Sequence, residues 1–139
     1  MAVWMGRAPL AVALMLGCGA QALPEPSQNA SSVRFCEQAL AGSIDPTEVF
    51  TIPGVYTSDD LHGGFSPTAC PRIGFDWSTE AMPSARRDAL RAYMDGIRGD
   101  QRGGFINYPI TLTGRIEMRR GRYGMAARHM VVADFGLPD

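Results

Sequence analysis

The clearest pattern of hydrophobic and polar positions lies near the C-terminus, in residues 109–119. Apolar residues or glycine take every second position there, at Ile110, Leu112, Gly114, Ile116 and Met118. This alternation predicts a β-strand with one buried face. Residues 120–124 then predict a turn, and residues 125–135 a partner strand that completes a hairpin. Gly114 in mid-strand predicts a sharp bend.

A helical period follows in residues 84–97. Leu90, Tyr93, Met94 and Ile97 are spaced i, i+3, i+4 and i+7, which places them on one apolar stripe. The charged residues of this segment are expected on the outer face, namely Arg86, Arg87, Asp88 and Arg91. A shorter helix is predicted over residues 33–40.

The segment before the long helix is rich in β-formers. Residues 48–57 predict a strand, in which Pro53 and Gly54 indicate a bulge or bend. Residues 65–76 predict one or two short strands, broken at Cys70 and Pro71. The element order predicts a mainly β, α+β fold with one helix, namely an OB-like, five-stranded, partly open barrel. The alternative is an antiparallel sheet with one covering helix.

The N-terminus has the layout of a secretory signal peptide. Arg7 precedes a short apolar run, and small residues end at Ala20-Gln21-Ala22. The run is shorter than the roughly 20 residues that span a bilayer. We therefore expect a signal peptide over residues 1–22, a flexible linker over 23–32 and a single OB-like domain over 33–139. The protein is expected to be exported, either to the periplasm or as a secreted protein.

The three cysteines refine this expectation. Cys18 follows Met15-Leu16-Gly17 and resembles a lipobox cysteine, so lipidation at Cys18 is the alternative to cleavage after Ala22, and it would tether the protein to a membrane. Cys36 and Cys70 remain after export, and in an oxidising compartment they are expected to form a disulfide. Phe75 and Trp77 nearby are expected in the core.

The charge balance is close to neutral. Once Arg7 is removed, 12 arginines face 14 carboxylates, and lysine is absent. This balance argues against a nucleic-acid ligand, because nucleic-acid binders usually carry a basic excess. The arginines concentrate in the last hairpin, which suggests a contact surface for an envelope protein, a glycan or an anionic lipid, made of Arg115, Arg119, Arg122, Tyr123 and Arg128. The alternative is a solvated, salt-bridged outer face.

One loop carries candidate chemistry. His62 follows Asp59 and Asp60, and such a set could bind a metal or act as an acid–base pair in a small hydrolase. The simpler alternative is that the aspartates cap a turn. A metal site needs three or four ligands, and the sequence has no nucleophile elbow, P-loop or dinucleotide motif. We therefore predict no catalytic residue, no metal and no cofactor.

Several short motifs resemble a group of small exported bacterial proteins. They are Gly54-Val55-Tyr56, His62-Gly63, Ala69-Cys70-Pro71 and Thr111-Leu112-Thr113-Gly114-Arg115. That group has no established activity, so the resemblance implies export and supplies no catalytic residue to carry over. The sequence as a whole favours a non-enzymatic, exported binding or envelope-associated domain. A small extracytoplasmic hydrolase using His62, and an inhibitor or chaperone-like partner of another secreted protein, are the alternatives.

Overall fold

A computed structural model describes residues 28–59, 61–121 and 123–138. The elements along the chain are α1 (Gln28–Leu40), β1 (Phe50–Ser58), β2 (Gly63–Pro67), β3 (Asp76–Ser78), α2 (Ser84–Arg98), β4 (Ile106–Arg120) and β5 (Ala126–Gly136). The predicted signal peptide (residues 1–22) and Cys18 lie outside the described residues. Within the described residues, no helix is long and apolar enough to cross a bilayer. The predicted long helix and the C-terminal hairpin are both confirmed.

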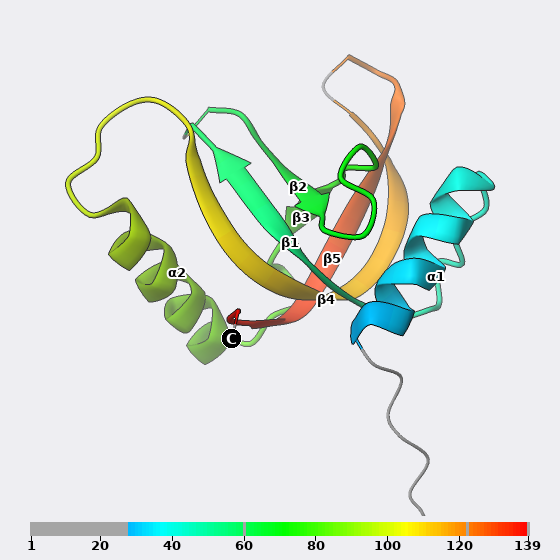
Figure 1. The fold of residues 1–139 in the computed structure, drawn as a ribbon, viewed down its shortest axis with the longest axis horizontal. Coiled ribbons are helices and arrows are strands. Elements are labelled where there is room, and N and C mark those ends of the chain that lie inside the picture. The colour runs from blue at the N-terminus through cyan, green and yellow to red at the C-terminus, as the bar shows by residue number, and fades with distance from the viewer. Residues whose placement is uncertain (1–27, 60, 122, 139) are drawn as a thin grey trace, which may run out of the picture.

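The strands form one curled sheet in the order β2-β1-β4-β5-β3 (Figure 1). Neighbouring strands are antiparallel except β3 and β5, which run parallel. A bridge between Phe65 and Phe75 brings β2 to the start of β3, so the two edges of the sheet approach each other. The sheet is therefore a half-barrel, which confirms the predicted α+β class and the OB-like, partly open five-stranded barrel.

Alternate residues of β1 and β4 fill the barrel. Phe50 and Ile52 on β1 are fully buried, as is Leu112 on β4. Phe35 on α1 joins them, with its ring centroid 5.8 Å from that of Phe50 and 5.4 Å from that of Phe75. A helix outside the sheet thus contributes to the same hydrophobic core, which fixes α1 to the barrel wall.

The bend predicted at Gly114 is confirmed. The β4–β5 register shifts between Thr113 and Gly114, and a Cβ on Gly114 would lie 2.2 Å from the Val131 carbonyl oxygen. Only glycine allows this close backbone approach. Figure 1 shows the strong curvature of β4. Met118, expected on the buried face, is 59% exposed, because β4 continues beyond the core after Ile116.

The bulge predicted at Pro53 and Gly54 is wrong. Strand β1 pairs with β4 in unbroken register from Phe50 to Ser58. The Pro53 carbonyl accepts a hydrogen bond from the Thr68 amide at 3.0 Å, so the backbone nitrogen of Pro53 also faces away from β4. The missing N–H therefore costs no bond to β4. Gly54 instead makes room for β2, since its Cβ would lie 2.3 Å from the Ser66 carbonyl oxygen.

Helix α1 begins at Gln28 rather than at Val33, so residues 28–32, expected in the linker, are helical. The first turn is held by the barrel: Ser31 Oγ accepts a hydrogen bond from the Thr51 amide at 2.8 Å, and Ser32 is buried. These tertiary contacts stabilise a helical turn that has no apolar periodicity of its own.

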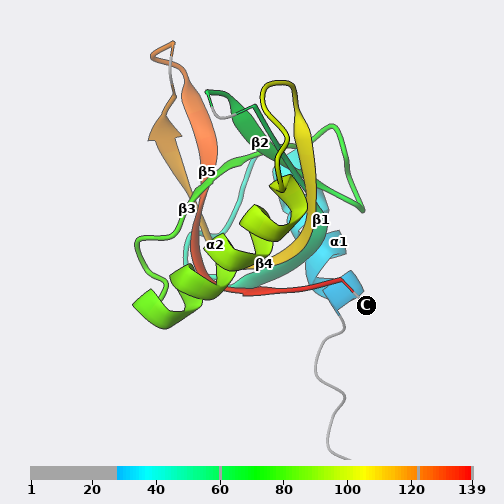
Figure 2. The ribbon, with the colours of Figure 1, turned by 90° about the vertical axis from the view of Figure 1, so that its left-hand side faces the viewer.

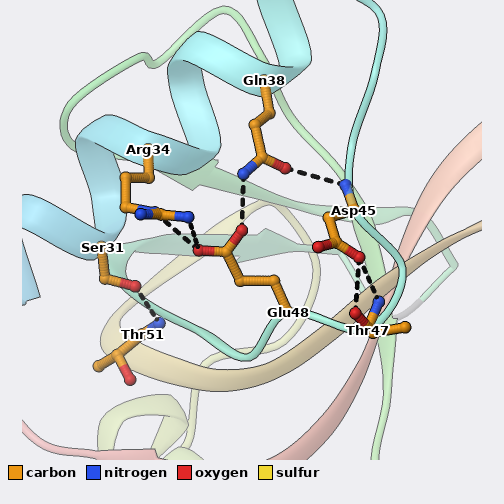
Figure 3. Close-up of polar contacts among 7 residues, drawn as sticks. All are labelled: Ser31, Arg34, Gln38, Asp45, Thr47, Glu48 and Thr51. Atoms are coloured by element: carbon orange, nitrogen blue, oxygen red, sulfur yellow. Dashed lines mark hydrogen bonds and ion pairs between the residues drawn. The ribbon is translucent and has the colours of Figure 1, made fainter.

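A polar network and a disulfide hold the rest of α1. Arg34 and Gln38 both donate to the Glu48 carboxylate, at 2.7 and 2.6 Å (Figure 3). These bonds lower the pKa of Glu48, with Arg34 as the largest cause. Cys36 is bonded to Cys70, as predicted. The disulfide joins α1 to the loop between β2 and β3.

Candidate ligand-binding groove

Helix α2 is anchored at its N-terminal end by Arg86. Its Nε donates to Asp134 Oδ1 at 2.9 Å, its Nη2 donates to the Phe135 carbonyl at 2.8 Å, and its guanidinium lies 4.5 Å from the Phe135 ring centroid. The bond to Arg86 lowers the pKa of Asp134. Arg86 is exposed, as expected, but its side chain also reaches across to β5, a contact that the sequence did not predict.

Other residues of α2 complete this attachment. Leu90 is 5% exposed, and the Tyr93 hydroxyl donates to the Pro109 carbonyl. Burial raises the pKa of Tyr93. Figure 2 shows α2 lying across the barrel, between β3 and β5 on one side and β1 and β4 on the other. The helix therefore lies across the open side of the barrel, and residues along it line a hollow against the strands.

That hollow is a groove of about 590 Å³ between α2 and the barrel. Three aromatic residues from three strands line it: Tyr56 on β1, Trp77 on β3 and Tyr108 on β4. The α2 side is lined by Arg87, Leu90, Arg91, Met94, Asp95 and Arg98, and the β3 side by Asp76, Ser78 and Thr79. Trp77, expected in the core, is only partly buried, whereas Phe75 is buried as expected.

The aromatic floor has a defined geometry. The Tyr56 ring lies 5.0 Å from Trp77 at 89° and 5.9 Å from Tyr108 at 26°. Tyr108 is 1% exposed, so a buried ring is stacked on Tyr56 and supports it. Gly63 on β2 permits this arrangement, since a Cβ there would lie 2.5 Å from the Tyr56 hydroxyl oxygen. The floor is thus an ordered aromatic surface.

The helical wall of the groove carries arginines with little internal pairing. Arg87 and Arg91 are one turn apart and share a helix face. Arg91 approaches Asp88 at 3.9 Å in an exposed pair, and Arg87 makes no ion pair with any described residue. By contrast, Arg34 and Arg86 are each bound by a carboxylate at 2.7 and 2.9 Å. The groove therefore presents available positive charge beside aromatic surface.

The hairpin arginines are differently placed. Arg119 is held by Glu117 and Glu80, each at 2.5 Å, so its charge is neutralised locally. Arg128 donates to the Gly74 carbonyl at 3.3 Å. Arg115 is exposed on β4 and Tyr123 is 87% exposed at the turn, while Arg122 lies outside the described residues. The structure does not gather these residues into one hollow.

A histidine joins the cluster around Arg119. His129 Nε2 lies 2.9 Å from Ser78 Oγ and 3.1 Å from Arg119 Nη1. Both neighbours can donate to an unprotonated nitrogen. Burial, followed by the nearby charge of Arg119, lowers the pKa of His129. The same guanidinium lowers the pKa of Glu80. This cluster ties β3 to β4 and β5 behind the groove.

The loop with Asp59 and His62 is a capped turn. Asp59 Oδ1 accepts hydrogen bonds from the backbone amides of Leu61, at 3.0 Å, and His62, at 2.5 Å. These bonds lower the pKa of Asp59, with the His62 amide as the largest cause. His62 Nδ1 lies 3.4 Å from Asp59 Oδ2, and the His62 side chain is 57% exposed. Asp60 lies outside the described residues.

Among the described residues, no group of three or more His, Cys, Asp or Glu side chains converges on a metal-sized site. Comparisons with protein-family models, with curated proteins and with solved structures found no match. The candidate site therefore rests on the geometry of this chain. The groove aromatics and arginines were missed from the sequence, where the only available signal was the one-turn spacing of Arg87 and Arg91.

Proposed function

We propose that this protein is an exported, non-enzymatic binding domain whose ligand lies in the groove beneath α2. The observation that carries the proposal is the aromatic floor of Tyr56 and Trp77 beside the arginines Arg87 and Arg91. Sites for small ligands usually combine apolar surface with a few placed polar groups. The groove fits that description, and its volume of about 590 Å³ is within the usual range.

The groove replaces the C-terminal hairpin as the preferred contact surface. Arg119 is already bound by two carboxylates, so a ligand would have to compete with Glu80 and Glu117 for its guanidinium. Arg87 has no such competitor among the described residues. A ligand anion would therefore gain more at the groove than at the hairpin.

Export is supported by the signal-like residues 1–22 and is compatible with the disulfide between Cys36 and Cys70. The intact mass of the mature protein from its native host tests this part. A chain beginning at Leu23 indicates a soluble exported protein, and one beginning at a lipidated Cys18 indicates a tethered one. A chain that retains Met1 would refute export.

The groove is tested through its own fluorophore. Trp77 is the only tryptophan after residue 22, because the other one in the chain is Trp4. An array of envelope glycans, acidic peptides and anionic phospholipid vesicles is screened for binding, and hits are titrated by Trp77 emission. We expect binding to shift the emission of Trp77. We expect the double variant Arg87→Gln/Arg91→Gln to show no such shift.

The matched control is Arg115→Gln/Arg120→Gln, which removes two exposed arginines of β4 outside the groove. We expect this variant to bind as the wild type does. If the control loses binding and the groove variant keeps it, the hairpin is the contact surface and the groove assignment is wrong. Equal thermal midpoints of the variants and the wild type exclude unfolding as the cause.

A further inference from the structure

We propose, resting on the function above, that the groove ligand is an acidic oligosaccharide, with a sugar ring against the aromatic floor and its carboxylate between Arg87 and Arg91. Three features of the groove lead to this class: two neighbouring cations without strong partners, carboxylates on both sides, and an aromatic surface of ordered rings.

The two arginines are the reason for proposing a carboxylate group on the ligand. Arg87 and Arg91 share one face of α2, and like charges one turn apart repel each other. Among the described residues, the exposed contact of Arg91 with Asp88 at 3.9 Å is the one ion pair that either arginine makes. A carboxylate between two guanidinium groups would relieve the repulsion, because their planar donor forks match carboxylate geometry.

The two aspartates that line the groove are the reason for proposing a sugar. Asp76 on β3 and Asp95 on α2 also line the groove, and neither makes an ion pair with another described residue. Hydroxyl groups both donate and accept hydrogen bonds, so they can bond to these carboxylates and to the arginines together. A phosphate-rich polyanion has few hydroxyl donors for Asp76 and Asp95, so their repulsion would be offset less than for an oligosaccharide whose hydroxyl groups donate to them.

The aromatic floor supplies the third part of the contact. Tyr56 and Trp77 are partly exposed, and Tyr108, which stacks on Tyr56, is buried. Such side chains offer apolar surface with a polar atom at one end. The C–H face of a pyranose ring fits apolar surface, while its hydroxyl rim reaches the polar walls.

An acidic peptide is the competing occupant, and the strand pairing disfavours it. Tyr56 on β1 is paired with both β2 and β4, so β1 has no backbone edge for a peptide to join. The two edge strands, β2 and β3, are only five and three residues long, and the bridge between Phe65 and Phe75 occupies part of the edge of β2. A sugar needs no strand edge and therefore fits better.

The test is a titration of the mature protein, followed by Trp77 emission, with short oligomers of galacturonate, glucuronate and mannuronate. Each is compared with the same oligomer after reduction of its carboxylates to neutral hydroxymethyl groups, and with a glutamate peptide of equal charge. We expect at least one acidic oligomer to bind with a Kd at least tenfold lower than its reduced form and than the peptide. We expect Arg87→Gln/Arg91→Gln to remove that difference, and Arg115→Gln/Arg120→Gln to preserve it.

Each of the other possible results contradicts one named part of the proposal. Equal binding of the reduced oligomer refutes the role of the carboxylate, and equal binding of the peptide refutes the sugar. If no uronate oligomer binds while another ligand of the array shifts Trp77 emission, the acidic saccharide is wrong and the binding function stands. If nothing in the array reaches the groove, both proposals fail. Added salt must also weaken uronate binding in the wild type, a measurement that needs no variant.

Discussion

Opening the Cys36–Cys70 disulfide should cost a large share of the stability of this domain. The bond joins α1 to the loop between β2 and β3, across a sequence separation of 34 residues. In the chain-entropy model, a loop of that length stabilises the fold by about 3.8 kcal/mol, because the cross-link restricts the unfolded chain. Folded domains are stable by only about 5–15 kcal/mol, so the loss is severe.

Thermal and urea unfolding of the oxidised and reduced wild-type protein measure this cost without any change of sequence. For a domain of roughly 110 residues, the unfolding entropy converts about 3.8 kcal/mol into a fall of about 16 °C in Tm. The variant Cys36→Ala/Cys70→Ala should fall further, because Cys36 is only 8% exposed and its sulfur also packs in the core. A difference between oxidised and reduced protein below about 1 kcal/mol would refute the entropic reasoning.

Two further predictions concern the bend in β4 and the network that holds α1. Gly114→Ala should lower the free energy of unfolding by about 1–3 kcal/mol, because its Cβ would lie 2.2 Å from the Val131 carbonyl oxygen. Gly96→Ala, with open space around it in α2, should raise that free energy by roughly 0.8 kcal/mol; urea unfolding checks both, and an unchanged Gly114→Ala protein would contradict the close approach. The bond to Arg34 holds the pKa of Glu48 below its ordinary value of 4.5, so its stabilisation is complete above that pH and is lost as the pH falls through the lower folded value. Glu48→Gln should therefore flatten this part of the Tm profile below about pH 5, and parallel profiles would count against the network.

Local elements were largely predictable from the sequence. The alternation around Leu112 and Ile116 predicted β4, and the stripe containing Leu90 predicted α2, because both patterns involve consecutive residues. The disulfide followed from the two cysteines downstream of the predicted signal peptide. The bend at Gly114 was also predicted, since an isolated glycine in a strand often marks a close backbone approach.

The errors have a common cause in contacts between distant segments. The first turn of α1 was assigned to a linker, and it is helical because the Thr51 amide bonds to Ser31. The contacts of Arg86 with a carboxylate and a carbonyl of β5 were not predicted, although Arg86 is exposed as expected. Pro53 was expected to mark a bulge, and it fits a regular strand because its nitrogen faces away from β4. None of these partners lies near its residue in sequence.

By itself, the sequence determined the periodic elements, the α+β class and the pairing of its two downstream cysteines. The tertiary structure alone decided which side chains share the groove. Tyr56 lies beside Tyr108 because β1 and β4 pair in that register, and Trp77 joins them because β3 is held by β5. Register and strand order depend on packing across the whole barrel. The residues of a site built from three strands and a helix are therefore scattered along the sequence and form no continuous motif.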